Sequence, residues 1–368
     1  MSDRSDARLL IDTLRLTPPD KSPDLTAEWK RADAHAIIRL AEHEGVALWL
    51  QRRLTLLHIR LEGGARERLR AAAKAAAAQC LRIDAESSAT LAVFAQAGVR
   101  CVPLKAAAVR LLSASVPYAT SRAPGDVDVL CHPDDAQRGW MLLKSRGYAS
   151  PKSAPADGHH LPALVGPSGI GVEIHLSTTA RMAPEEAWRR ATCDQRAVRT
   201  KGGVHAIPGE TELVWHSLAH SVVSASDVGR SGTRLKHWLD AAAILSAGVD
   251  MDWPRIAQRL ERGESEHPAL ARAWLGTAID LGGRRIPEAA AIAPAGSGVN
   301  IERMLAWRLH VLRRKEPRGR WAEKLLEEGA RGEAGLPFDP AGPRAGALAR
   351  VRHALASRAA RAWWTIRR

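Results

Sequence analysis

The chain has 368 residues and a formal net charge of +14 at pH 7, and 45% of its residues are hydrophobic. This composition is that of a globular protein, so it excludes an intrinsically disordered chain, and the length suits more than one domain. No run of about 18 apolar, uncharged residues occurs, and the first residues lack an apolar segment, so we expect neither a membrane-spanning helix nor a signal peptide.

The positive charge allows two interpretations. A basic surface attracts polyanions such as nucleic acid, nucleotides and anionic lipid, whereas an arginine-rich surface can also serve solubility alone. The four cysteines form no Cys-x-x-Cys pair, which argues against a zinc site or a disulfide framework. This cysteine usage is typical of a reducing compartment, so we expect a cytoplasmic protein.

Residues 1–97 are expected to form an N-terminal helical lobe. Residues 1–26 are polar and contain prolines, which indicates a loose lead-in. Apolar residues then recur at three- and four-residue spacings, which is the pattern of amphipathic helices. The alanine-rich stretch from Ala65 predicts one long helix that ends at Gly98, because glycine readily adopts the left-handed conformation that follows a helix.

Residues 98–205 are expected to form a small α/β core. A short strand over residues 99–104 leads into a helix that begins at about Ala106. The segment DVDVLC, residues 126–131, alternates in character and predicts a second strand.

The rest of this core continues with a helix and a hairpin. The helix begins at Asp134 or Asp135 and ends at Gly147. Residues 159–165 and 170–176 predict the two arms of a hairpin, joined by the turn sequence GPSG. The sheet is therefore expected to be mixed or antiparallel.

Residues 206–295 are expected to form a C-terminal helical lobe, with ETELVWHSLAHSVV and LKHWLDAAAILSAG as its clearest helices. His216 and His220 share one helical face, as two zinc ligands would. The segment HSLAH lacks the glutamate of the H-E-x-x-H motif, so packing or a substrate pocket is preferred over zinc. Asp240 either orients a neighbouring side chain or is exposed.

Residues 296–368 are expected to form a basic, arginine-rich extension. Residues 341–368 contain seven Arg and no Asp or Glu, and the final segment predicts a basic amphipathic helix with Trp363 and Trp364. Such a helix suits peripheral contact with an anionic membrane, RNA or an acidic partner. The alternative is that the tryptophans pack on the protein's own helical lobe.

Two aspartates lie in the second predicted strand. Asp126 and Asp128 are two residues apart, so their side chains point to the same face, while Val127 and Val129 face the other side. Two carboxylates this close repel each other unless a cation lies between them. Mg²⁺ is commonly bound by one or two carboxylates together with substrate phosphates. The alternative is an edge strand with solvated aspartates.

The hairpin carries a third carboxylate. In GVEIHLS, Glu173 and His175 share one face of the strand and the apolar residues share the other. If this strand lies beside the first, Glu173 joins the aspartates, and three carboxylates can hold two metal ions about 3.5–4 Å apart. Glu173 could also accept a proton from an incoming hydroxyl. The alternative is that Glu173 faces solvent.

These motifs together resemble a known family. In chain order they are VPLKAAAV, RAPGDVDVL, RGY, HH, VEIHLS, HSLAH and LKHWLD. They resemble the uncharacterised nucleotidyltransferase-like family of the polymerase-β-like nucleotidyltransferase superfamily, over roughly Trp29 to Leu260. The resemblance implies an α+β fold, with a small mixed-sheet nucleotidyltransferase core flanked by N- and C-terminal helical lobes.

The resemblance also assigns the site. Asp126, Asp128 and Glu173 would be the catalytic residues and the ligands of two Mg²⁺ ions. The residues expected to bind substrate and phosphate are Lys105, Arg122, Ser121, His175 and His160, of which Lys105 and Arg122 would offset phosphate charge. For His175, which follows the acidic residue by two positions, a supporting role is preferred over that of a ligand. Of the adjacent His159 and His160, we expect one to face the site, because neighbouring side chains on a strand alternate.

The chain departs from the family pattern in two places. Relatives have glycine where this chain has Ala106, and glycine allows backbone amides to approach phosphate closely. The Gly-Ser loop of better-known superfamily members is also absent. Neither departure removes the carboxylates.

Two functions follow as hypotheses. The first is an Mg²⁺-dependent nucleotidyltransferase that transfers NMP from a nucleoside triphosphate to a hydroxyl or phosphate of an acceptor. Relatives occur among bacterial biosynthetic genes, so a peptide or small molecule is the favoured acceptor, and the basic charge keeps RNA open. The alternative is a catalytically degenerate protein that binds nucleic acid or a protein partner through its basic surface.

Overall fold

The computed structural model describes residues 2–17, 24–112, 116–150, 159–179, 182–200, 203–223, 234–248, 250–264, 268–283, 286–293 and 301–313. The α-helices are α1 (Asp3–Leu14), α2 (Leu25–Arg31), α3 (Ala34–His43), α4 (Ala47–Leu56), α5 (Gly63–Gln96), α6 (Lys105–Leu111), α7 (Pro133–Ser145), α8 (Pro184–Thr192), α9 (Glu210–Val223), α10 (Leu235–Ser246), α11 (Trp253–Glu261), α12 (Pro268–Gly282) and α13 (Ile301–Arg313). Two short 3₁₀ helices are η1 (Pro117–Ser121) and η2 (Pro287–Ala289). The strands are β1 (Cys101–Pro103), β2 (Asp126–Cys131), β3 (Leu164–Val165), β4 (Gly171–His175), β5 (Arg196–Thr200) and β6 (Gly203–Ile207). This confirms the expected α+β class.

The four-stranded sheet is mixed and has the order β1-β2-β4-β3. β2 runs antiparallel to β1 and parallel to β4, and the expected hairpin is formed by the antiparallel pair β3 and β4. In the parallel pair, Asp128 lies opposite Glu173 and Asp126 lies opposite Gly171. The alternation read from the sequence therefore places both aspartates and Glu173 on one face.

The other face of the sheet is apolar. Val127 and Val129 of β2 are fully buried and belong to one cluster with Phe94 of α5 and Leu143 of α7. Burying an aliphatic side chain of this size contributes about 1.5–3 kcal/mol, so this face anchors the sheet. The polar face is thereby left for the site.

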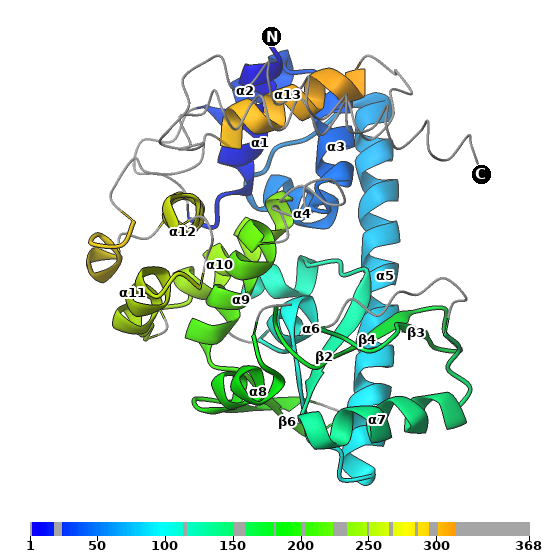
Figure 1. Ribbon diagram of the computed structural model, residues 1–368. Helices are drawn as coiled ribbons and strands as arrows, with labels where there is room; N and C mark the ends of the chain where they lie inside the picture. The colour runs from blue at the N-terminus through cyan, green and yellow to red at the C-terminus, as the bar shows by residue number, and fades with distance from the viewer. Residues whose placement is uncertain are drawn as a thin grey trace, which may run out of the picture.

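Helix α5 connects the sheet with the rest of the molecule. It runs along one side of the protein, from the helical part to the sheet (Figure 1). Ala65 and Leu69 at its beginning pack in the helical core, whereas Ile83 and Phe94 pack under the sheet. As expected, Gly98 follows its end with φ +64°.

The N- and C-terminal helices share one apolar core. Leu10 of α1 and Leu309 of α13 are fully buried in the same cluster as Trp238 of α10. Figure 1 shows α13 lying beside α1. The buried Arg308 of α13 also contacts both carboxylate oxygens of Glu44 at 2.9 Å. Residues 301–313 of the expected basic extension therefore form a helix of the core.

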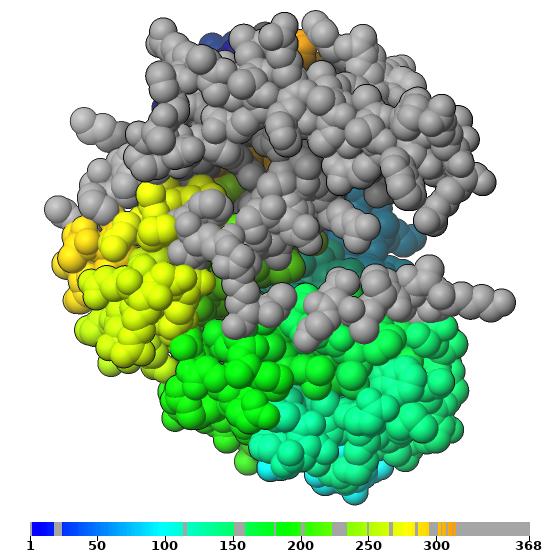
Figure 2. Space-filling model, viewed as in Figure 1, coloured from blue at the N-terminus to red at the C-terminus, as the bar shows by residue number. Residues whose placement is uncertain are grey.

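The space-filling view shows the α/β core, in cyan to green, as the lower part of the molecule, with α11 and α12 in yellow beside it (Figure 2). The expected amphipathic C-terminal helix, with Trp363 and Trp364, lies outside the described residues. Among the helices that are described, none is both long and apolar enough to cross a membrane.

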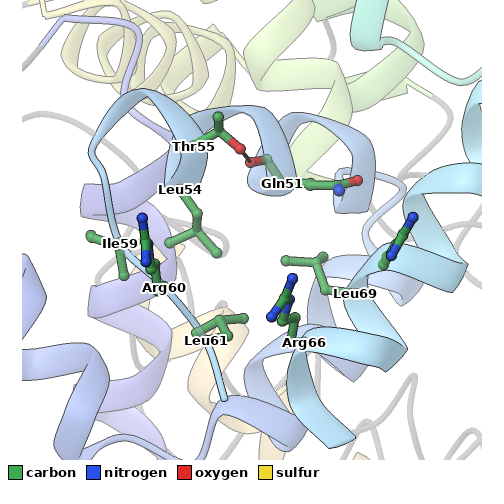
Figure 3. A pocket seen from close by; sticks show the side chains of 9 residues that line it. Gln51, Leu54, Thr55, Ile59, Arg60, Leu61, Arg66 and Leu69 are labelled. Atoms are coloured by element: carbon green, nitrogen blue, oxygen red, sulfur yellow. Dashed lines mark hydrogen bonds between the residues drawn. The ribbon is translucent and has the colours of Figure 1, made fainter. Parts of the chain in front are cut away.

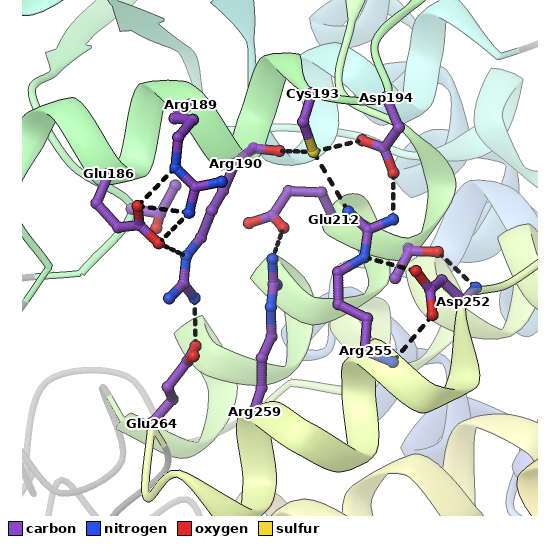
Figure 4. A network of polar contacts seen from close by, with 12 residues as sticks. Glu186, Arg189, Arg190, Cys193, Asp194, Glu212, Asp252, Arg255, Arg259 and Glu264 are labelled. Atoms are coloured by element: carbon purple, nitrogen blue, oxygen red, sulfur yellow. Dashed lines mark hydrogen bonds and ion pairs between the residues drawn. The ribbon is translucent and has the colours of Figure 1, made fainter.

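A network of ion pairs connects the segment after β4 to the C-terminal helices (Figure 4). Arg259 of α11 contacts Glu212 of α9 at 2.5 Å, and both side chains are buried. Arg255 of α11 contacts Asp194, just after α8, at 2.6 Å. This network joins α9, α11 and the end of α8, and so holds these helices together.

The two-stranded hairpin β5–β6 was not expected from the sequence. Its strands pair antiparallel, from Arg196 opposite Ile207 to Thr200 opposite Gly203. Gly203, the first residue of β6, has φ +129°, a conformation that favours glycine. The segment RAVRT has no regular alternation of apolar and polar residues, so it carried little signal for a strand.

Candidate active site

The backbone places Lys105 beside Asp128. The amide of Leu104, which follows β1, donates a hydrogen bond to the carbonyl oxygen of Asp128 at 2.9 Å. Lys105 begins α6 with φ +47°, which residues other than glycine rarely adopt. Its Nζ donates a hydrogen bond to Asp128 Oδ1 at 2.7 Å, so strand β2 and the start of α6 share one ion pair.

Three side chains form a group that could hold a metal ion. The ligand atoms of Asp128, Glu173 and His175 lie within 4.8 Å of one another. His175 Nε2 is 2.8 Å from Asp128 Oδ1 and 3.6 Å from Glu173 Oε2. The side chain of Glu173 is 26% exposed, against 3% for the other two, so Glu173 forms the open side of the group. His175 was expected to bind substrate, and here its ring nitrogen lies directly beside both carboxylates.

Asp126 lies on the same face but outside this three-residue group. Its strand partner is Gly171, so no side chain of β4 lies directly opposite Asp126. The charge of Asp128, followed by burial, raises the pKa of Asp126 to about 6. The repulsion between Asp126 and Asp128 that their spacing predicts therefore raises the pKa of Asp126 in the folded protein.

Cations compensate for the buried charge of Asp128. Burial alone would raise the pKa of Asp128, but Lys105 and His175 lower it well below its usual range. Burial would likewise lower the pKa values of Lys105 and His175, but the neighbouring carboxylates raise both on balance. The close contact with His175, whose Nε2 is 3.6 Å away, is the main reason why the pKa of Glu173 is lowered. The site is therefore an anionic cluster that already contains cationic partners.

Arg122 is paired inside the protein. Its Nε contacts the two carboxylate oxygens of Asp240 at 2.8 and 2.9 Å, and one terminal nitrogen donates to the Ala123 carbonyl at 2.8 Å. Both side chains are only 5% exposed. Asp240 thus orients Arg122, one of the two roles expected for it. Ser121 ends η1 and is buried, and phosphate binding by Arg122 and Ser121 stays a prediction.

Both histidines of the HH motif lie close to His175. The ring centroids of His159 and His160 are 5.7 and 5.6 Å from that of His175. Only one of the pair was expected to face the site. The strict alternation fails because His159 is in a bend and His160 makes a single isolated bridge to His175, so neither belongs to a regular strand.

Helices α9 and α10 add further histidines. His216 is buried, and neither of its ring nitrogens has a hydrogen-bond partner within the described part of the chain. The rings of His220 and His237 lie 5.4 Å apart. Burial, followed by the charge of Lys105 for His216 and His220, lowers the pKa values of these residues, so they are neutral.

Sequence reasoning missed two residues of α10. Burial, and then the charge of Arg122, lowers the pKa of Lys236 to about 8. Lys236 and His237 both precede Asp240 in the segment LKHWLD. Lys236 is four residues before Asp240, so one helical face carries both, and this spacing was the available signal.

The donor set fits a divalent cation. Carboxylate oxygens are the ligands that Mg²⁺ prefers, and an imidazole nitrogen additionally suits Mn²⁺ or Zn²⁺. Asp128 and Glu173 present such oxygens from neighbouring strands in fixed register. Both side chains are held by hydrogen bonds or ion pairs in their present positions, which reduces the cost of assembling the site.

A separate pocket of about 700 Å³ lies between α4 and α5 (Figure 3). Its lining is Gln51, Leu54, Thr55, Ile59, Arg60, Leu61, Arg66, Leu69 and Arg70. The floor is aliphatic and the rim carries three exposed arginines. None of the expected site residues lines it, so it is distinct from the carboxylate cluster.

Comparison with known proteins agrees with the motifs. A family model described as "Uncharacterised nucleotidyltransferase" matches residues 30–278. One similar solved structure is that of an antigenic nucleotidyltransferase-like protein from Paracoccidioides brasiliensis, with 16% identity and a TM-score of 0.35, covering 57% of this chain and 96% of that one. No curated protein matches the chain. The family match spans every residue of the site, and the chain therefore belongs to the uncharacterised nucleotidyltransferase family.

Proposed function

We propose that this protein is an Mg²⁺-dependent nucleotidyltransferase that transfers NMP from a nucleoside triphosphate to a hydroxyl or phosphate of an acceptor. The observation that carries the proposal is the strand register that pairs Asp128 with Glu173, with Asp126 on the same face. Family membership supports the reaction class.

The proposed roles follow from the positions of the side chains. Asp126, Asp128 and Glu173 would hold two Mg²⁺ ions, which stabilise the attacking and leaving oxygens in a phosphoryl displacement. The acceptor oxygen would attack the α-phosphorus, the bond between the α- and β-phosphates would break, and pyrophosphate would leave. Glu173, the most exposed of the cluster, would take the acceptor's proton. Lys105 would offset the charge of the phosphates.

The proposed acceptor is a small molecule or a peptide. Because the net charge of +14 would attract nucleic acid, RNA should also be tested as an acceptor. The rival function is a degenerate member that binds nucleic acid or a protein partner through its basic surface. One observation favours the rival: Lys105 and Arg122 are both already paired with aspartates of the protein itself.

Calorimetric titration with each of the four nucleoside triphosphates in the presence of Mg²⁺ tests the proposal. We expect one or more to bind to the wild type, and binding to be lost in Asp126→Asn/Asp128→Asn. Asp134→Asn, at a side chain that is 77% exposed on α7, is the matched control and should bind normally. If the folded wild type binds no nucleotide but binds RNA with a steep dependence on salt, the rival function is correct.

A further inference from the structure

Lys105 occupies an unusual place for a phosphate-binding residue. Its ammonium group is 2.7 Å from Asp128 Oδ1, and Asp128 is one of the proposed metal ligands. The charges of Asp126, Asp128 and Glu173 all act on it and stabilise its charged form. The ammonium group therefore lies among the same carboxylates that a divalent cation would need.

We propose that Lys105 is a built-in cation that holds the carboxylate cluster together in the metal-free protein and moves to the triphosphate when metal and nucleotide enter. The inference rests on the proposed function. It adds a specific consequence: lysine and metal compete for Asp128, so metal alone binds weakly and metal with nucleotide binds cooperatively. A shared site of this kind makes the coupling reciprocal between the two ligands.

The comparison with Arg122 explains why Lys105 suits this exchange. A lysine carries a compact charge on a flexible chain, whereas a guanidinium group is a rigid fork. The side chain of Lys105 is 21% exposed and, within the described part of the chain, donates one hydrogen bond, to Asp128. Arg122 is 5% exposed and is held by Asp240 and by the Ala123 carbonyl. Lys105 is therefore more exposed than Arg122, and its departure leaves Asp128 with the contact to His175.

The backbone keeps the base of the Lys105 side chain in place during such an exchange. Lys105 retains φ +47° between a strand end that is bonded to Asp128 and the first turn of α6. Strained conformations of this kind persist where the surrounding structure determines them, and they cluster at functional sites. Only the end of the side chain needs to move, and Asp128 keeps its second partner, His175, when the ammonium group leaves.

Metal binding without nucleotide tests the proposal. Mn²⁺ is titrated into the full chain, and free Mn²⁺ is followed by electron paramagnetic resonance. We expect Lys105→Met to bind Mn²⁺ roughly tenfold more tightly than the wild type, in the usual range of coupling between linked sites. Inorganic triphosphate, which carries no base, should instead bind less tightly to Lys105→Met when Mn²⁺ is present. Lys105→Gln removes the charge but keeps a polar end on a slightly shorter side chain, and serves as a second variant.

Two controls separate exchange from a general change in charge. Lys236→Met removes a nearby cation whose charge acts on Asp126 as well as on Arg122, Arg234 and Asp240, and Lys74→Met removes an exposed one on α5. An increase in Mn²⁺ affinity in Lys236→Met as large as in Lys105→Met would contradict the proposed exchange. The loss of any nearby positive charge would then explain the change in affinity. We expect Lys74→Met to match the wild type.

The outcomes also separate this inference from the proposed function. If the wild type and every Lys105 variant fail to bind Mn²⁺, with or without triphosphate, the proposed function fails. If Mn²⁺ binds and Asp128→Asn abolishes binding, but Lys105→Met leaves the affinity unchanged or lower, the exchange fails and the function stands. Opposite changes in Mn²⁺ and triphosphate affinity in Lys105→Met support the exchange.

Discussion

Two buried ion pairs lie near strand β2, and they differ in what surrounds them. Arg122 and Asp240 form a pair, shielded from solvent, that joins the end of η1 to helix α10. Lys105 and Asp128 form a pair that is surrounded by further ionisable groups and partly open to solvent. The first pair satisfies its charges within the protein. The second leaves excess negative charge, so it is the pair that a metal or substrate can change.

The largest expected effect is on the second pair. Asp128→Asn should abolish Mg²⁺-dependent nucleotide binding and lower transferase activity by at least about 100-fold, because a neutral amide cannot replace the charge of a carboxylate that would hold the metal. Calorimetry measures the binding, and pyrophosphate release measures the activity. Retention of both in a well-folded variant would show that Asp128 is not a metal ligand.

The first pair should matter most for stability. Arg122→Met leaves the carboxylate of Asp240 buried and unpaired, and should lower the free energy of unfolding by about 3–5 kcal/mol. Urea denaturation measures this value. The double variant Arg122→Met/Asp240→Leu removes both charges and should recover much of the loss. If Arg122→Met lowers the free energy of unfolding by less than about 1 kcal/mol, the pair does not stabilise the fold as proposed.

The pH dependence should reveal the repulsion at Asp126. In the metal-free folded protein its pKa is about 6, above the usual value of 3.8, so it keeps a proton that the unfolded chain has already lost. A rise in pH from about 4 to about 6 should therefore lower the free energy of unfolding through this residue. The difference between wild type and Asp126→Asn isolates this contribution from that of Asp128. Equal pH profiles for the two proteins would contradict it.

The same titration should affect metal binding in the opposite sense. Below a pH of about 6, the proton on Asp126 competes with the metal, so Mn²⁺ should bind less tightly as the pH falls. Mn²⁺ titrations at several pH values measure the change. In Asp126→Asn, the part of the decline centred near pH 6 should be absent.

Substitutions in the pocket between α4 and α5 should have the smallest effect on nucleotide binding. Arg66 and Arg70 have no ion-pair partner within the described ranges, and both are exposed. Arg66→Glu/Arg70→Glu should change Mg²⁺-dependent nucleotide affinity by less than about twofold at physiological salt, because exposed charges at a distance are screened. Calorimetry under the same conditions checks this. A larger loss would place part of the substrate in this pocket.

Much of the site could be predicted because strand periodicity is a local property. The alternation in DVDVLC and GVEIHL was sufficient to place Asp126, Asp128 and Glu173 on polar faces, and the hairpin turn was recognisable from GPSG. The family motifs supplied the assumption that the two strands are neighbours. Where the backbone leaves regular structure, as at His159 and His160, the local rule no longer applied.

The partners of the ionisable groups could not be predicted in the same way. Arg122 and Asp240 are 118 residues apart in the chain, and the side chain of either could equally have faced solvent. The apolar contact between α1 and α13 likewise joins opposite ends of the described chain.

The sequence by itself determined the class of the fold, the strands that carry the carboxylates and the family, because these follow from local periodicity and from motifs in order. The tertiary structure alone decided which cation holds which carboxylate. In the folded chain, Lys105 pairs with Asp128, His175 also contacts Asp128, and Arg122 pairs with Asp240 away from the carboxylate cluster. The physical reason is that ion pairs depend on distances of a few ångströms between distant segments, which the packing of α6, α10 and the sheet sets.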